Sequence, residues 1–206
     1  KQRGLKRAPS LFLVVQSELT QRLKMKLVDA YKLPAQLTAL ETIRRGQAAS
    51  AMNYKARLSG SADAKLLQDL NDIFENYDPN HHLVGIKATY DYKVDFKDRH
   101  SKTVKYVAGN IVEDPKPFEN TSTCGGGLHF SIANSPSSMQ NSLMSKEEKG
   151  SRFHIALLNA KDTVLVGSDK FKVKSAEVVF TGSFKDCYRL LQALFGTLDT
   201  AKNLVK

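Results

Sequence analysis

Apolar residues along the first 60 positions recur three or four residues apart, which is typical of amphipathic helices. One such run ends at Tyr31. A second begins at Pro34, which suits the first turn of a helix, and stops at Gly46, which suits a C-terminal cap. A third follows over about 47–58. The pattern therefore predicts three short helices in this part of the chain.

A fourth helix is predicted after the Ser59-Gly60-Ser61 break. Ser61 and Asp63 suit its N-terminal cap. Its apolar face would consist of Leu66, Leu67, Leu70, Ile73 and Phe74.

At Leu83 the spacing changes from helical to alternating. Apolar residues then stand at every second position up to Phe96, which predicts one long strand. A bulge or a turn is expected at Gly109-Asn110. Further strands are predicted over 104–108, 111–112, 127–132, 153–158, 163–166 and 171–180. Ser183 suits the cap of a final amphipathic helix, whose apolar face would be Leu190, Leu191, Leu194, Phe195 and Leu198.

This order of elements predicts an α+β fold. Short N-terminal helices would form a basic helical region over residues 1–80. A mainly antiparallel β domain, closed by a C-terminal amphipathic helix, would follow over residues 81–206.

Positive charge is concentrated near the N-terminus. The formal net charge is +10, and residues 1–60 hold 12 Lys and Arg against 3 Asp and Glu, a balance of +9. This asymmetry indicates an acidic partner, such as a neighbouring protein, nucleic acid or an anionic membrane face. A solvated basic face that aids solubility would give the same pattern. The candidate partner-binding residues are Lys1, Arg3, Lys6, Arg7, Arg22, Lys24, Lys26, Arg44, Arg45, Lys55 and Arg57.

Other sequence signals narrow the expected class. No apolar run reaches the length of a membrane span, and no signal-peptide pattern is visible. Cys124 and Cys187 are too few for a disulfide framework. Histidines and cysteines form neither a C-x-x-C nor an H-E-x-x-H motif, so we expect no metal and no cofactor. These signals favour a reducing, intracellular location.

Three consecutive glycines, Gly125, Gly126 and Gly127, precede a predicted strand that carries His129. Glycine allows φ > 0 and close approach of another group, at a cost of up to about 1 kcal/mol per residue relative to alanine. The run could form a tight entry into a central strand, or a nest of N–H groups that faces an anion. It matches neither a P-loop nor the dinucleotide-binding fingerprint. His129 itself suits a strand-end histidine, or a base beside a Cys124 nucleophile.

The segments "YVAGNIVEDP" (106–115), "CGGGLHFS" (124–131) and "RFHIALLNAKDTVLVGSDKFKVKSAEVVF" (152–180) resemble an uncharacterised domain family of phage and giant-virus proteins. Members of that family carry a Cys-x-x-Gly-Leu-His core, a strand that leads to Asp-Lys, and a closing strand. The resemblance covers about residues 83–180. It implies a viral protein and no particular reaction.

A second, shorter stretch, "GGGLHFSIA" (125–133) followed by "NSPSSM", is similar to the nicotinamide-pocket strand of ADP-ribosyltransferases. This resemblance implies a nucleotide cradle at Gly125, Gly126 and Gly127. His129 would stack on the nicotinamide, and Glu177 would supply the acid.

We therefore expect a non-enzymatic component of a large assembly, preferably a minor capsid or virion protein. Its basic helical region would dock acidic neighbours. The alternatives are an ADP-ribosyltransferase-like enzyme and a nucleic-acid-binding protein that acts through residues 1–57.

Overall fold

The computed structural model of this 206-residue chain describes residues 34–54, 64–91, 96–97, 104–119, 126–134, 152–167 and 170–195. The chain divides into two compact units, Lys1–Ala39 and Leu40–Lys206. A helix occupies residues 34–52. The elements that follow it are α3 (Ala64–Glu75), β1 (His82–Asp91), β2 (Phe96–Lys97), β3 (Asn110–Glu113), β4 (Leu128–Ile132), β5 (Arg152–Asn159), η2 (Ala160–Asp162), β6 (Val164–Val166), β7 (Lys170–Val173), β8 (Ser175–Gly182) and α5 (Phe184–Phe195).

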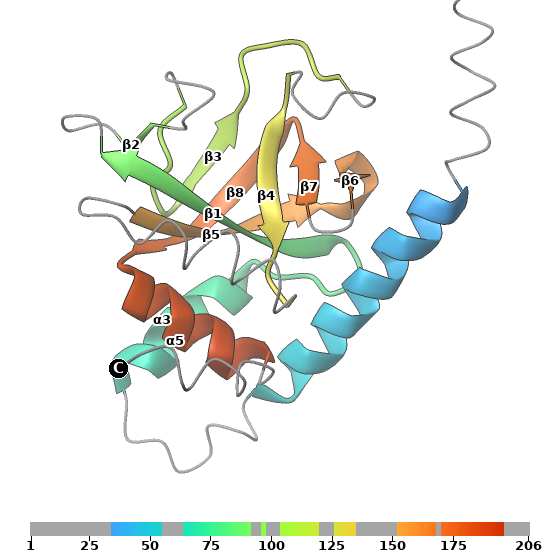
Figure 1. Ribbon diagram of the computed structural model, residues 1–206. Coiled ribbons are helices and arrows are strands. Elements are labelled where there is room, and N and C mark those ends of the chain that lie inside the picture. The colour runs from blue at the N-terminus through green and yellow to red at the C-terminus, as the bar shows by residue number, and fades with distance from the viewer. Residues whose placement is uncertain are drawn as a thin grey trace, which may run out of the picture. The chain divides into compact units, whose positions relative to one another are not determined.

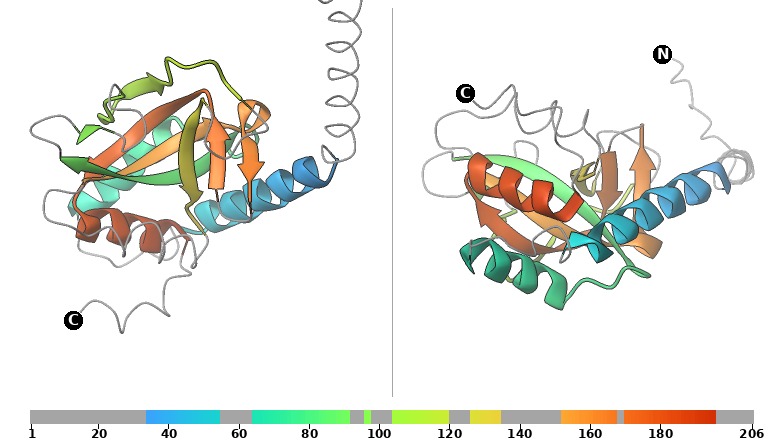
Figure 2. Two further views of the ribbon diagram at one scale, coloured as in Figure 1. Left: turned by 45° about the horizontal axis from the view of Figure 1, so that its top comes forward. Right: turned by 90° about the horizontal axis from the view of Figure 1, so that it is seen from below.

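The described strands form one antiparallel sheet in the order β3-β8-β5-β1-β4-β7-β6, with β2 paired to β1 outside this path. The sheet is strongly twisted, and α3 and α5 lie against one of its faces (Figures 1 and 2). The predicted α+β class, mainly antiparallel β with a closing helix, is confirmed.

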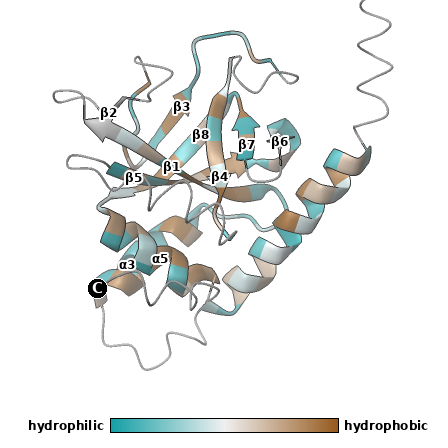
Figure 3. Cartoon of the chain, in the orientation of Figure 1, coloured by the Kyte–Doolittle hydropathy of each residue, from teal (hydrophilic) through white to brown (hydrophobic). Residues whose placement is uncertain are grey.

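Both faces of the central strand β1 are buried. On the helix side, Val84 and Ile86 pack with apolar residues of β5, α3 and α5. On the opposite side, Leu83 packs with Tyr106, Phe130 and further buried residues of β4, β7 and β8. The helices α3 and α5 each combine hydrophilic and hydrophobic positions, as expected of elements that bury a single face (Figure 3).

The predicted helices α3 and α5 are present. Leu70 and Ile73 of α3 are buried, as are Leu190, Leu191, Leu194 and Phe195 of α5. Ser183 caps α5, because its Oγ accepts the N–H of Asp186 at 3.2 Å. The helix expected before Tyr31, the cap residues Ser61 and Asp63, and Leu198 lie outside the described residues.

The predicted helix end at Gly46 is wrong, because one helix continues through residues 34–52. Gln47, the next residue, is fully buried. Its side chain accepts the N–H of Val84 at 2.7 Å and donates to the carbonyl of Val84 at 2.8 Å. These bonds hold the helix against β1, so tertiary contacts outweigh the low helix propensity of glycine.

Two strand predictions are also wrong. The strand expected from Leu83 to Phe96 ends at Asp91, and Phe96 pairs back with Asp91, so the chain reverses between them. The strand expected over 171–180 is divided at Lys174 into β7, which pairs with β4 and β6, and β8, which pairs with β5 and β3. Alternation gives the side-chain period but not the direction of the chain.

Most of the other predicted β segments are confirmed. The turn at Gly109 is present, with φ of 87°, and β3 begins directly after it. Strands at 127–132, 153–158 and 163–166 correspond to β4, β5 and β6. Residues 104–108 form no regular strand, although Val104 and Tyr106 are buried.

Along the sequence, the boundary between the two compact units lies between Ala39 and Leu40. Residues of α3 share one core with β1, β5 and α5, so the elements on both sides of residue 80 belong to one unit.

Replacing Gln47 by leucine would leave the buried N–H of Val84 without its partner, and the C=O of Val84 would keep only the bond from the N–H of Ala133 at 3.3 Å. We expect Gln47→Leu to lower the free energy of unfolding by about 2–4 kcal/mol. Urea denaturation followed by circular dichroism would measure this loss. The matched control is Gln68→Leu on the exposed face of α3, which should change stability by less than about 0.5 kcal/mol. Equal effects of the two substitutions would contradict this role of Gln47.

Candidate functional site

The glycine-rich entry into β4 lies beneath the loop of residues 114–119. A Cβ atom added to Gly126 would overlap the carbonyl oxygen of Pro117. At Gly127, where φ is 123°, it would lie 2.9 Å from Cε of Lys172 and 3.0 Å from Cδ2 of Phe118. The N–H of Glu119 also donates to the carbonyl of Gly126 at 3.1 Å. The loop therefore takes up the space that these glycines leave open.

Asp114 anchors this loop through its buried carboxylate. Oδ2 accepts the N–H of Gly127 at 2.8 Å, and Oδ1 accepts the N–H of Lys116 at 3.0 Å. The N–H of Asp114 donates to the carbonyl of Lys174 at 3.1 Å. Asp114 thus joins the end of β3, the entry to β4 and the bend between β7 and β8. The anion that faces the N–H of Gly127 is supplied by the protein itself.

Two lysines lie buried near this entry. Lys87 of β1 donates to the carbonyl of His129 at 3.0 Å. Its Nζ lies 5.2 Å from the ring centre of Tyr106 and 5.7 Å from that of Phe130. Lys172 of β7 is fully buried, with Nζ 5.8 Å from the ring centre of Phe118. Cation–π contacts and the carbonyl bond offset part of the cost of burying these charges.

His154 of β5 ties three strands together. Its Nε2 lies 2.8 Å from Oγ1 of Thr89 in β1, and its Nδ1 lies 2.9 Å from Oγ1 of Thr181 in β8. Burial, together with the positive charges of Lys87 and Arg152, lowers the pKa of His154 to about 3. The imidazole is therefore neutral at pH 7, and both of its nitrogens are engaged with threonine hydroxyls.

The residues of the expected nucleotide cradle are not brought together. His129 stands in β4 opposite Lys172, whereas Glu177 stands in β8, and β5 and β1 lie between these strands. The carboxylate of Glu177 accepts a hydrogen bond from Nδ2 of Asn76 at 2.8 Å. Gly125 lies outside the described residues.

Cys187, the cysteine that the described residues include, is poorly suited to act as a nucleophile. Cys187 is buried in α5, and burial raises the pKa of its thiol. Cys124, the candidate partner of His129, lies outside the described residues.

Only two of the candidate partner-binding residues are described. Arg44 donates from Nε and Nη2 to the carboxylate of Glu41 at 2.7 and 2.6 Å and from Nη1 to the carbonyl of Pro79, and its side chain is 14% exposed. Arg45 also bonds Glu41 but is 76% exposed. Hydrogen bonds from both arginines lower the pKa of Glu41 to about 2. Arg44 is thus part of an internal contact, and Arg45 remains at the surface.

The other candidate partner-binding residues lie outside the described ranges. They are Lys1, Arg3, Lys6, Arg7, Arg22, Lys24, Lys26, Lys55 and Arg57.

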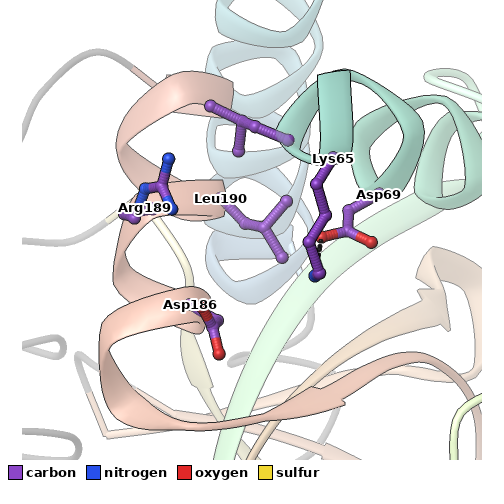
Figure 4. Close-up of a pocket in the computed structure, with 6 residues that line it drawn as sticks. Lys65, Asp69, Asp186, Arg189 and Leu190 are labelled. Carbon is purple, nitrogen blue, oxygen red and sulfur yellow. Dashed lines mark hydrogen bonds and ion pairs between the residues drawn. The ribbon is translucent and has the colours of Figure 1, made fainter. Parts of the chain in front are cut away.

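A small hollow separates α3 from α5 (Figure 4). Its lining includes Lys65, Asp69, Asp186 and Arg189, and Lys65 pairs with Asp69 at 2.9 Å. The volume of about 20 Å³ holds one water molecule and excludes a nucleotide. Within the described ranges, no three His, Cys, Asp or Glu side chains are grouped as metal ligands would be. The helices seen in those ranges are too short or too polar to cross a membrane.

Sequence patterns singled out the glycines but missed the polar residues that pack around them. Lys87 lies on the same face of β1 as Leu83 and Gly85, and the alternation of apolar residues gives no sign that this lysine is buried. Asp114 carries no such signal, because it lies in a loop without periodicity, 13 residues before Gly127.

No protein-family model, curated protein or solved structure matches the chain.

The overlap at Gly126 predicts a clear effect of a single methyl group. Gly126→Ala should lower the free energy of unfolding by about 2–3 kcal/mol, because loop 114–119 must shift. The control is Gly46→Ala inside the helix, where the new methyl group would meet Nδ2 of Asn134 at an ordinary 3.7 Å. That change should raise stability by about 0.5–1 kcal/mol. Chemical denaturation measures both, and an unchanged Gly126→Ala protein would contradict the packing described for the loop.

The buried neutral histidine predicts acid sensitivity. Since unfolded histidine titrates near pH 6.5 and His154 near 3, the unfolded chain binds the extra proton between these values. His154 therefore contributes fully above about pH 6.5, and its contribution falls by up to about 1.4 kcal/mol per pH unit toward pH 3. Unfolding free energies measured from pH 7 to 4 should show this slope in the wild type but a smaller slope in His154→Gln. Equal slopes in the two proteins would refute it.

Proposed function

We propose that this chain is a non-enzymatic component of a larger assembly, in the preferred version a minor capsid or virion protein. Residues 1–60 dock acidic surfaces of neighbouring proteins. The observation that carries this proposal is the charge distribution: residues 1–60 have a balance of +9, whereas residues 61–206 hold 19 Lys and Arg against 18 Asp and Glu.

The described body supports a structural role. The polar groups best suited to chemistry bond other parts of the same chain: Asp114 holds the entry to β4, and His154 joins three strands. Gly126 and Gly127 face the chain's own loop. Such a body suits a rigid support for a charged docking segment.

Nucleic acid is the second candidate partner, because phosphates are attracted by the same charge. The ADP-ribosyltransferase reading has less support, since Glu177 bonds Asn76 and stands in β8, which is separated from β4 by the two strands β5 and β1.

Binding of the full chain to polyglutamate tests the proposal. We expect binding that weakens steeply between about 50 and 300 mM salt. Replacing Arg22, Lys24 and Lys26 by glutamine should weaken it about tenfold, if each charge contributes about 0.5 kcal/mol.

The matched control removes three exposed lysines of the β domain, Lys161, Lys170 and Lys185, and should bind nearly as the wild type does. Tighter binding to duplex DNA than to polyglutamate would favour the nucleic-acid alternative. Salt-independent binding, or an equal loss in both triple variants, would contradict docking through residues 1–60.

A further inference from the structure

The strand β3 stands at one end of the sheet order and, among the described residues, pairs with β8 alone. The bond from Asp114 N–H to the carbonyl of Lys174 sets the direction of its backbone groups. Since successive residues of an antiparallel strand present these groups to alternate edges, those of Val112 face β8. The N–H and C=O groups of Ile111 and Glu113 therefore face the outer edge.

Apolar side chains are exposed on β3 and just before it in the chain. Val112 is buried in the sheet core, whereas the neighbouring Ile111 is 75% exposed and Val107 is 46% exposed. Of four large apolar side chains exposed in the described part of the chain, these two lie within five residues of one another. An open backbone edge beside an exposed apolar side chain is the combination used in recognition by β-strand addition.

We propose that a second copy of this chain docks on this edge, with the two β3 strands antiparallel about a two-fold axis at Ile111. The backbone groups of Ile111 then bond those of Ile111 in the other copy. The exposed side chains of both isoleucines lie side by side on one face of a continuous sheet.

The position of Glu113 selects this register. With Ile111 opposite Ile111, each Glu113 faces Gly109, around which a Cβ would meet nothing within 4 Å. The two Glu113 residues are then about 14 Å apart along the strands. A shift by two residues would place the apolar Ile111 opposite the charged Glu113. A shift by four would place the two glutamates opposite each other, which is unfavourable because each carboxylate is balanced only by the exposed Lys174 of its own chain, at 3.2 Å.

Proline is one of the residues that commonly protect sheet edges, and here it limits the length of the interface. Pro115 offers no N–H, so a partner strand cannot extend past Glu113. The paired segment is therefore short, and association is weak and dependent on concentration. This inference is independent of the positive charge of residues 1–60, because edge pairing involves backbone and apolar groups. We therefore expect the pairing to persist at high salt.

Disulfide trapping tests the register directly. In a Cys124→Ser background, Ile111→Cys places two thiols on strands whose Cα atoms are about 5.5 Å apart, within disulfide reach. The matched control, Glu113→Cys, places them about 14 Å apart. At about 100 µM protein in 0.5 M salt with a mild oxidant, we expect Ile111→Cys to form covalent dimers at least about ten times faster. Equal rates, or faster trapping through position 113, would overturn the proposal.

Sedimentation velocity tests the same contact without cross-linking. The wild type should show a rising dimer fraction up to about 500 µM, and Ile111→Lys should remain monomeric. Met52→Lys is the control, because Met52 is 78% exposed on a helix and should leave the dimer intact. Thermal unfolding of Ile111→Lys should match the wild type, since the side chain is outside the core. A monomeric wild type at the highest concentration would refute the dimer.

Discussion

The packing of the loop after β3 against the entry to β4 depends on the buried carboxylate of Asp114. It binds the N–H of Gly127 at 2.8 Å, while its own backbone binds Lys174 at the bend between β7 and β8. Segments that follow β3, precede β4 and join β7 to β8 therefore meet at one residue, Asp114. Because the loop lies so close, Gly126 has no room for a Cβ, and the cost of flexible glycines is offset by packing.

The same principle extends to other polar groups inside the domain. Gln47 bonds both backbone groups of Val84, Lys87 takes the carbonyl of His129, and His154 links Thr89 and Thr181. Each of these bonds satisfies a group that burial would otherwise leave without water. These buried polar groups thus stabilise the sheet. Our two proposals consequently rest on surfaces, one being the positive charge of residues 1–60 and the other the outer edge of β3.

The sequence predicted elements whose burial follows a simple period, such as α5 with its Ser183 cap, and the strands β4 and β5. It did not predict where strands turn, because the reversal after Asp91 and the bend at Lys174 interrupt neither the alternation nor the apolar content enough to be seen. Apolar spacing does lengthen from two residues to three between Val173 and Ala176, which is the one local sign of that bend. The glycines were recognisable, but their partner Asp114 was not, since contacts between loops leave no periodic trace.

Amide hydrogen exchange at Gly127 tests the central claim most directly. If Asp114 and loop 114–119 cover the glycine-rich entry, this amide is protected in the ligand-free protein, and Asp114→Asn reduces that protection. Adding NAD then changes nothing. Rapid exchange at Gly127 that slows on addition of NAD would show that the entry is open to a nucleotide and would contradict the account.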